Sequence, residues 1–157
     1  MTQKIVKHIT DLGLKIAVAE SVTGGGVAAK IISVPGASKI INEAFVAYSD
    51  QAKIDRLDVN PRILRKFGAV SPQVAAMMAI GVADATGVDI GISTTGIASP
   101  IINSKKPVGL VYISIYFQGA TLTRKLLLKG NRKQIIAQTI THVQKLLQER
   151  LNCDRIR

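Results

Sequence analysis

The sequence is poor in the residues that build disulfides and metal sites. Its 157 residues include one cysteine, Cys153, and two histidines, His8 and His142, which lie far apart along the chain. A single cysteine cannot form an internal disulfide, which favours a reducing compartment, and this set of residues predicts no transition-metal site. We therefore expect a cytoplasmic protein that uses neither a metal ion nor a cofactor.

Long apolar runs are also missing. No stretch approaches the roughly 20 residues that span a bilayer, and the amphipathic start MTQKIVKHITDLG lacks the apolar core of a signal peptide. Apolar residues nevertheless make up 47% of the chain and are spread evenly, which excludes low-complexity disorder. The sequence predicts one domain over residues 1–157, with a sizeable core and no membrane partner.

Acidic residues are scarce. The chain has 10 Asp and Glu against 21 Lys and Arg, a formal net charge of +11, and no acidic residue from Ile90 to Gln148. A basic surface of this kind attracts nucleic acid or a phosphorylated small molecule. Because aromatic residues are only 4% of the chain and tryptophan is absent, no platform for stacking single-stranded nucleic acid is evident. Nucleic acid is therefore the less favoured partner.

Short apolar runs alternate with helical patterns along the chain. Strands are predicted over 16–19, 43–48, 88–93, 108–117 and 120–128, the last two as a hairpin around Gln118-Gly119. Helices are predicted over 2–12, 27–33, 50–57, 61–67, 72–86 and from Asn131 onward. This order predicts a layered α/β fold with a mixed sheet.

A glycine-rich turn joins the first predicted strand to the helix after it. The segment Thr23-Gly24-Gly25-Gly26 leads directly into the helix at 27–33. A strand, a glycine-rich turn and a helix in this order point backbone N–H groups at an anion. The common nucleotide motifs G-x-x-x-x-G-K-[ST] and G-x-G-x-x-G are absent, so these patterns alone indicate a basic α/β domain with a turn suited to an anion.

Seven short segments carry a more specific signal. They are AESVTGG (19–25), VPGAS (34–38), YSDQAK (48–53), FGAVS (67–71), TGIASP (95–100), KPVGLVYIS (106–114) and GNR (130–132). In this order they resemble the CinA C-terminal domain family over nearly the whole chain. The resemblance implies a single three-layer α/β/α domain and a homo-oligomer. It also implies a nicotinamide-nucleotide amidase of pyridine nucleotide salvage, which hydrolyses nicotinamide mononucleotide to nicotinate mononucleotide and ammonia.

The resemblance implies a catalytic group made of Ser21, Tyr48 and Lys53. Ser21 matches the serine nucleophile of the family pattern, and Lys53 matches a lysine that would act as its base in a Ser–Lys mechanism. Such a lysine has to lose its proton near neutral pH, which requires burial or a nearby positive charge. The Tyr48 phenol would pass protons between the other two side chains or hold the serine in place.

Further matched residues are expected to bind the substrate. They are Thr23, Gly24, Gly25, Thr95, Gly96 and Arg132. The backbone N–H groups around 23–25 would form an oxyanion hole or bind the phosphate. Arg132 would bind the phosphate through two guanidinium nitrogens, and Thr95 and Gly96 would border the substrate.

Each of these residues also has a purely structural interpretation. Ser21 or Thr23 would cap the following helix, Tyr48 would pack in the core, and Lys53 would be an exposed helical lysine. Arg132 would be solvated, although a cation in a first helical turn is mildly unfavourable against the helix dipole. The joint occurrence of Ser21, Tyr48 and Lys53 at matched positions favours the catalytic interpretation.

The chain departs from the family pattern at several positions. The departures are Val22 for cysteine, Asp50 for asparagine, Asn131 for aspartate, and Ser99 with residues 101–104 for a glycine-rich stretch. A carboxylate at Asp50 would raise the pKa of Lys53 if the two side chains approach in space. Since the loop that frames the substrate is altered, two alternatives stay open: a non-catalytic module that binds a phosphorylated nucleotide, and a nucleic-acid-binding domain.

Overall fold

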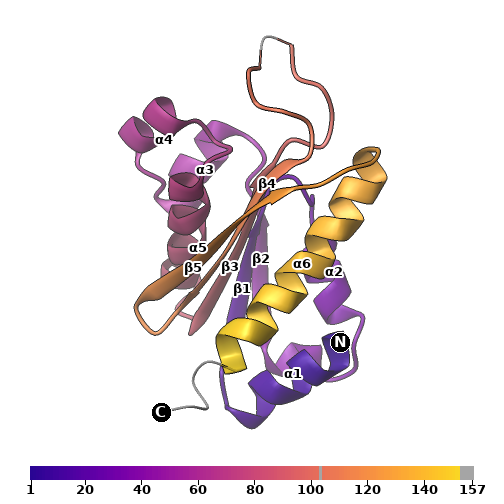
Figure 1. The fold of residues 1–157 in the computed structure, drawn as a ribbon. Coiled ribbons are helices and arrows are strands. Elements are labelled where there is room, and N and C mark those ends of the chain that lie inside the picture. Colours follow the sequence, from indigo (N-terminus) through magenta and orange to yellow (C-terminus); the bar gives the residue numbers. More distant parts are fainter. Residues whose placement is uncertain (103, 153–157) are drawn as a thin grey trace.

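Five strands form one sheet in the computed structural model, which describes residues 1–102 and 104–152. The strands are β1 (Ile16–Glu20), β2 (Ile41–Val46), β3 (Ile90–Gly96), β4 (Leu110–Phe117) and β5 (Ala120–Leu127). Their order across the sheet is β2-β1-β3-β4-β5 (Figure 1). Strands β1, β2 and β3 run parallel to one another. Strand β4 is antiparallel to β3, and β5 is antiparallel to β4, so the predicted mixed sheet is confirmed.

Six α-helices and one short 3₁₀ helix connect and cover the strands. They are α1 (Thr2–Asp11), α2 (Gly26–Ile32), η1 (Ala37–Lys39), α3 (Asp50–Leu57), α4 (Pro61–Phe67), α5 (Pro72–Thr86) and α6 (Arg132–Asn152). Within the described residues, none of the helices combines the length and the apolar character that crossing a bilayer requires. The helices predicted over 50–57, 61–67 and 72–86 are confirmed to the residue.

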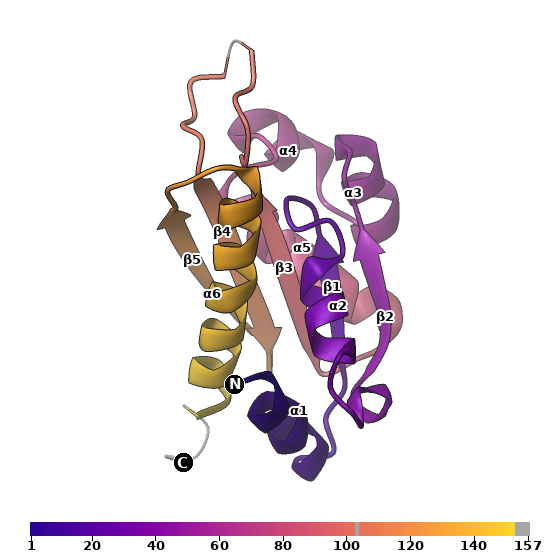
Figure 2. The ribbon, with the colours of Figure 1, turned by 90° about the vertical axis from the view of Figure 1, so that its right-hand side faces the viewer.

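The helices lie in two layers, one on each face of the sheet. Figure 2 shows α6 and α2 in front of the sheet and α5 behind it. In β1, the side chains of Ile16 and Val18 belong to the core under α1, α2 and α6, while Ala17 and Ala19 belong to the core under α3, α4 and α5. This split follows from the two-residue period of a strand. The three-layer α/β/α arrangement is therefore confirmed.

Each strand differs from its prediction at one end or both, and two of these differences bear on the site. Strand β3 continues through Gly96 instead of ending at Ser93, because its last residues pair with β4 as far as Gly96 opposite Val111. Strand β2 ends at Val46, so Ala47 and Tyr48 leave the sheet. The carboxyl ends of β1 and β3 therefore lie side by side, with the chain after β2 next to them.

The order of the strands reverses at this point of the sheet. From β1 the chain continues to β2 on one side and then crosses back to β3 on the other. In open α/β sheets such a reversal leaves a crevice outside the carboxyl ends of the strands, where ligands bind. The topology thus places the crevice directly after β1, where Ser21 follows Glu20.

Helix α5 approaches the sheet closely because small residues line the contact. A Cβ atom built on Gly91 of β3 would overlap the carbonyl oxygen of Ala79 in α5, and one built on Gly81 would overlap the carbonyl oxygen of Leu57 in α3. Neither obstacle is the end of a flexible side chain. Accommodating a methyl group at either position would therefore require the backbone to shift.

We expect Gly91→Ala to lower the free energy of unfolding by about 3 kcal/mol, since the added methyl group overpacks the contact between β3 and α5. Urea unfolding followed by circular dichroism measures this change. Gly13→Ala is the matched control, because Gly13 has open space around it and only a left-handed backbone (φ +67). Its expected loss is about 1 kcal/mol. Equal losses in the two variants would contradict the packing argument.

Candidate functional site

A cavity of about 260 Å³ opens at the carboxyl ends of β1 and β3. Its lining residues are Ser21, Val22, Tyr48, Asp50, Lys53, Ala69, Val70, residues 95–101 and Arg132. The fold therefore brings the three predicted catalytic residues together with Thr95, Gly96 and Arg132. Thr23, Gly24 and Gly25 do not line this cavity. Among the residues that the structure describes, no group of three or more His, Cys, Asp and Glu side chains could hold a metal ion.

Ser21 is held at the inner end of the cavity by the neighbouring strand. Its backbone N–H donates to the carbonyl oxygen of Thr94 in β3 at 3.0 Å, which extends the β1–β3 pairing by one residue. The serine is buried, with 9% of its surface exposed. It does not cap α2, whose N-cap is Gly25. The interpretation of Ser21 as a helix cap is therefore wrong.

Lys53 is enclosed by the protein although it lies on a short helix near the surface. Only 1% of the residue is exposed. Its Nζ donates to the carbonyl oxygen of Ala47 at 2.9 Å and to those of Tyr48 and Ser49 at 3.4 Å each. It also donates to Ser21 Oγ at 3.4 Å. The chain that leaves β2 thus wraps around the amine and directs it at Ser21, so the interpretation of Lys53 as an exposed lysine is wrong.

The environment of Lys53 makes its amine easier to deprotonate than an exposed lysine. Burial lowers the pKa of Lys53 below its ordinary value of 10.5, and the negative charge of Asp50 opposes that shift. The expected effect of Asp50 is confirmed in direction, but desolvation is the larger cause. A neutral lysine amine offers a lone pair, which can accept the proton of the Ser21 hydroxyl across the same contact.

Tyr48 lies where neither the catalytic nor the structural interpretation of this residue predicted. Its side chain lies at the mouth of the cavity and is 62% exposed, so it does not belong to the core. The phenol oxygen accepts a hydrogen bond from Arg132 Nη2 at 3.2 Å. In the described part of the chain, no hydrogen bond joins this phenol to Ser21 or Lys53, which instead binds the Tyr48 carbonyl oxygen. The geometry therefore does not support a role for Tyr48 as a proton relay between them.

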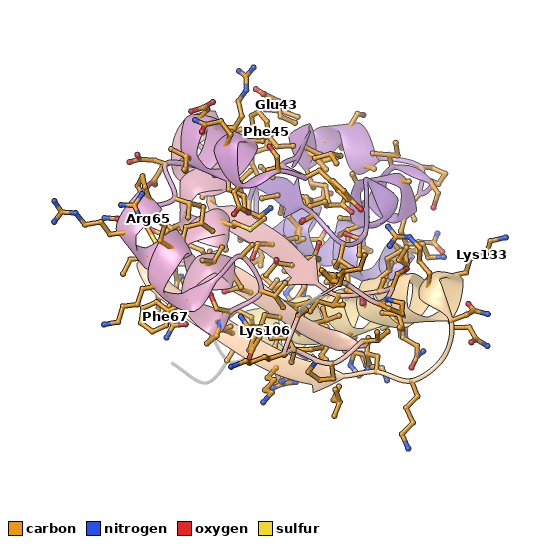
Figure 3. All side chains as sticks on the ribbon, turned by 90° about the horizontal axis from the view of Figure 1, so that it is seen from above. Glu43, Phe45, Arg65, Phe67, Lys106 and Lys133 are labelled. Carbon is orange, nitrogen blue, oxygen red and sulfur yellow. The ribbon has the colours of Figure 1, made fainter. Side chains whose placement is uncertain are left out.

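Arg132 bridges the mouth of the cavity from the start of α6. In addition to its bond with Tyr48, it donates from Nη1 to Ser99 Oγ at 3.3 Å. Asn131 begins the helix with a reciprocal cap, accepting from the Gln134 N–H at 3.0 Å and donating to Gln134 Oε1 at 2.8 Å. The neighbouring Lys133 extends away from the molecule (Figure 3). Arg132 is thus the basic side chain of α6 that lines the cavity, where it could bind an anionic group.

The glycine-rich turn binds an anion that belongs to the chain itself. Glu20 is fully buried, and its carboxylate accepts from the N–H groups of Gly25 and Val27 at 3.0 Å each and of Ala28 at 2.8 Å. The Gly24 N–H donates to the Ser21 carbonyl oxygen at 3.2 Å. Contrary to the prediction, Gly24 and Gly25 are not available to an oxyanion or a phosphate. A carboxylate directly before a glycine-rich turn was the signal for this internal cap.

Two free backbone donors remain beside Ser21. In residues 1–102 and 104–152, the N–H groups of Val22 and Thr23 make no hydrogen bond. The Thr23 hydroxyl shares a 2.7 Å hydrogen bond with that of Thr94, which fixes the turn against β3. An N–H directly after a nucleophile is a common component of an oxyanion hole. Val22 lines the cavity and is therefore a candidate donor, which the sequence analysis did not identify, whereas Thr23 does not line the cavity.

The side chains of Lys106 and Thr95 bind the chain between α4 and α5, whose residues Ala69 and Val70 line the cavity. Lys106 Nζ donates to the carbonyl oxygens of Phe67 at 2.9 Å and Val70 at 2.6 Å, and Thr95 Oγ1 donates to that of Ala69 at 2.8 Å. Figure 3 labels Lys106 and Phe67 on this side of the molecule. Sequence reasoning missed Lys106 because a lysine in a loop has no pattern that predicts two carbonyl partners in a distant segment.

We expect the stability of the protein to rise with pH in a way that depends on Lys53. Because the folded-state pKa lies below the unfolded value of 10.5, the unfolded chain binds more protons between those two values, and unfolding becomes harder as pH increases there. Lys53→Met removes this contribution. Urea unfolding at a series of pH values should therefore show a smaller rise for the variant than for the wild type. Equal slopes would contradict the burial of an ionisable amine.

The chain has clear relatives of known family. The model of the CinA C-terminal domain matches residues 1–151. A CinA-like protein of Kosmotoga olearia is 49% identical over 132 residues, which are 83% of this chain and 32% of that protein. A CinA-like protein of Dictyoglomus turgidum is 42% identical over 136 residues, which are 86% of this chain and 33% of that protein. The chain thus spans about a third of the length of these relatives.

Solved structures agree with this result. A competence-damaged protein (CinA) superfamily protein of Klebsiella pneumoniae superposes with a TM-score of 0.93 at 28% identity, over 96% of this chain and 95% of that one. The competence/damage inducible protein CihA of Agrobacterium tumefaciens gives a TM-score of 0.88 at 35% identity, over 96% and 93% of the two chains. The chain belongs to the CinA C-terminal domain family.

Proposed function

We propose that this domain hydrolyses the carboxamide of nicotinamide mononucleotide, giving nicotinate mononucleotide and ammonia. The observation that carries the proposal is the contact between Ser21 Oγ and the buried Nζ of Lys53, 3.4 Å apart at the inner end of a cavity. Catalytic hydrogen bonds are often long in the absence of substrate and shorten when it binds. A cytoplasmic location, a role in pyridine nucleotide salvage and self-association remain predictions that accompany this one.

We assign each chemical step of the proposed reaction to a group of the site. Neutral Lys53 accepts the hydroxyl proton of Ser21 as Oγ attacks the amide carbon. The N–H group of Val22, which lines the cavity beside Ser21, stabilises the oxyanion of the tetrahedral intermediate. The lysine then donates its proton to the departing nitrogen, which leaves as ammonia and gives an acyl-enzyme. A water molecule, deprotonated by Lys53, attacks this ester and releases the carboxylic acid and free Ser21.

The two ends of the cavity suit the two ends of the proposed substrate. The amide meets Ser21 and Lys53 at the inner end, and Arg132 lies at the mouth, where it binds the phosphate. Arginine favours phosphate because its planar fork donates two parallel hydrogen bonds. The lining also includes the apolar side chains of Val22, Val70 and Ile97, which suit the flat ring of the nicotinamide.

We expect Ser21→Ala to reduce turnover of nicotinamide mononucleotide at least about 1,000-fold, because no other group on the enzyme replaces the nucleophile. Analysis of nicotinate mononucleotide and ammonia in the reaction mixture measures the effect. Ser33→Ala is the matched control, since Ser33 is exposed at the end of α2 and does not line the cavity.

Two results would contradict the proposed mechanism. Full activity of folded Ser21→Ala would exclude the serine as the nucleophile. No product from folded wild-type protein at high enzyme concentration would exclude the amidase activity and favour the non-catalytic nucleotide-binding module.

We expect Arg132→Gln to raise the KM for nicotinamide mononucleotide about 10-fold, because a hydrogen-bonded charge pair with the phosphate is lost. The same variant should act on nicotinamide riboside, which lacks the phosphate, with an unchanged KM. Lys133→Gln removes an equal charge from the adjacent position, whose side chain points away from the molecule (Figure 3), and should change neither value. Similar effects of the two variants would indicate general electrostatic attraction instead of a phosphate site.

A further inference from the structure

Asp50 presents a carboxylate to the cavity without a partner in the protein. It is the first residue of α3 and lines the cavity together with Ser21 and Lys53. In residues 1–102 and 104–152, no hydrogen bond or ion pair engages this carboxylate. The helix does not depend on it for a cap, because Ser49 Oγ accepts from the Ala52 N–H at 3.0 Å. The helix dipole favours an acidic residue in the first turn of α3, and the same side chain also lines the cavity.

Basic and acidic side chains line the cavity at its inner end and toward its mouth. Three of the lining residues are basic or acidic: Lys53, Asp50 and Arg132. Lys53 is buried under three carbonyl oxygens, and Arg132 is held at the mouth by Tyr48 and Ser99. Asp50 is thus the one anionic side chain of the lining, and its charge acts on Lys53. A complementary ligand has a positive charge near its amide and a negative charge at its far end.

An N-ribosylated pyridinium carboxamide with a phosphate has this distribution of charge. We propose that Asp50 is a specificity-determining residue that selects a cationic ring over a neutral one at the amide end of the cavity. The inference rests on the proposed function for the identity of the amide end. The carboxylate attracts the ring through a charge interaction at the cavity wall, although Asp50 itself is exposed to solvent.

The negative charge of Asp50 also links substrate binding to the protonation of Lys53. In the free protein, Asp50 raises the pKa of Lys53 and so opposes the effect of burial. A cationic ring beside Asp50 offsets that negative charge, which lowers the pKa of Lys53 when the substrate binds. The other titratable groups that line the cavity, Tyr48 and Arg132, lie at its mouth and contact each other. The cationic substrate thus favours the neutral amine that accepts the Ser21 proton.

The test compares nicotinamide mononucleotide with its reduced form, which carries the same amide and phosphate on a neutral dihydropyridine ring. Calorimetric titration at pH 8, where the reduced form is stable, gives the Kd of each ligand for Ser21→Ala and for Ser21→Ala with Asp50→Asn. Asparagine keeps the shape of the side chain and removes its charge. We expect the added change to weaken binding of the cationic ligand about three-fold, the scale of a partly exposed charge pair, and to leave the neutral ligand unchanged.

Asp55→Asn, added to Ser21→Ala, is the matched control. Asp55 lies on the same helix and is exposed, but it does not line the cavity. This change should alter neither Kd. Equal weakening of both ligands by Asp50→Asn, no weakening of either, or failure of both ligands to bind folded Ser21→Ala would each overturn the assignment.

A kinetic measurement separates this inference from the proposed function. In otherwise wild-type protein, Asp50→Asn should move the acid limb of kcat/KM for the cationic substrate to lower pH, because the free-enzyme pKa of Lys53 falls. An acid limb that stays in place would overturn the link to the base. If wild-type protein hydrolyses neither ligand but charge-dependent binding persists, the proposed function fails and the assignment of Asp50 stands. If the wild-type protein and Asp50→Asn both hydrolyse the substrates, and with the same preference for the cationic ligand, the proposed function stands and the assignment of Asp50 fails.

Discussion

The enclosure of one amine shapes the whole site. Lys53 can be buried because the chain turns out of β2 and offers its amine three carbonyl oxygens from Ala47, Tyr48 and Ser49. An unpaired ammonium in such a place would be strongly unfavourable, and these oxygens offset part of that cost. The fourth partner of the amine is the hydroxyl of Ser21, which directly follows β1. The early end of β2, the cap of α3 at Ser49 and the reversal of strand order all serve to bring this amine to the end of β1.

The sequence was sufficient to predict the architecture because the determining features are local. The apolar run 16–19 and the hairpin around Gln118-Gly119 have the periods and turn residues of strands, and Ser71-Pro72 has those of a helix start. Where strands end is decided by partners far along the chain. Strand β3 extends to Gly96 because β4 pairs with it, and a single sequence does not contain that register.

The sequence was sufficient to predict which residues lie at the candidate site, but less so to predict which partners their side chains bind. Segment matching placed Ser21, Lys53, Thr95, Gly96 and Arg132 in one group, and all of them line the cavity. The direction of each side chain depends on the tertiary structure, so the contact of the Tyr48 phenol with Arg132 could not be read from the chain. The same limit applies to Glu20, whose carboxylate satisfies the glycine-rich turn. The pattern of an anion-binding turn was present, but its anion is internal.

Glu20 also decides where an anionic ligand can be bound. Its carboxylate already occupies the N–H groups of Gly25, Val27 and Ala28 at the start of α2. The start of this helix is therefore not open to the anionic group of a ligand, although a helix N-terminus is otherwise a ready site for one. The lining of the cavity offers such a group Arg132 instead, at the mouth. The carboxylate that stabilises the turn thus leaves the binding of an external anion to a side chain of α6.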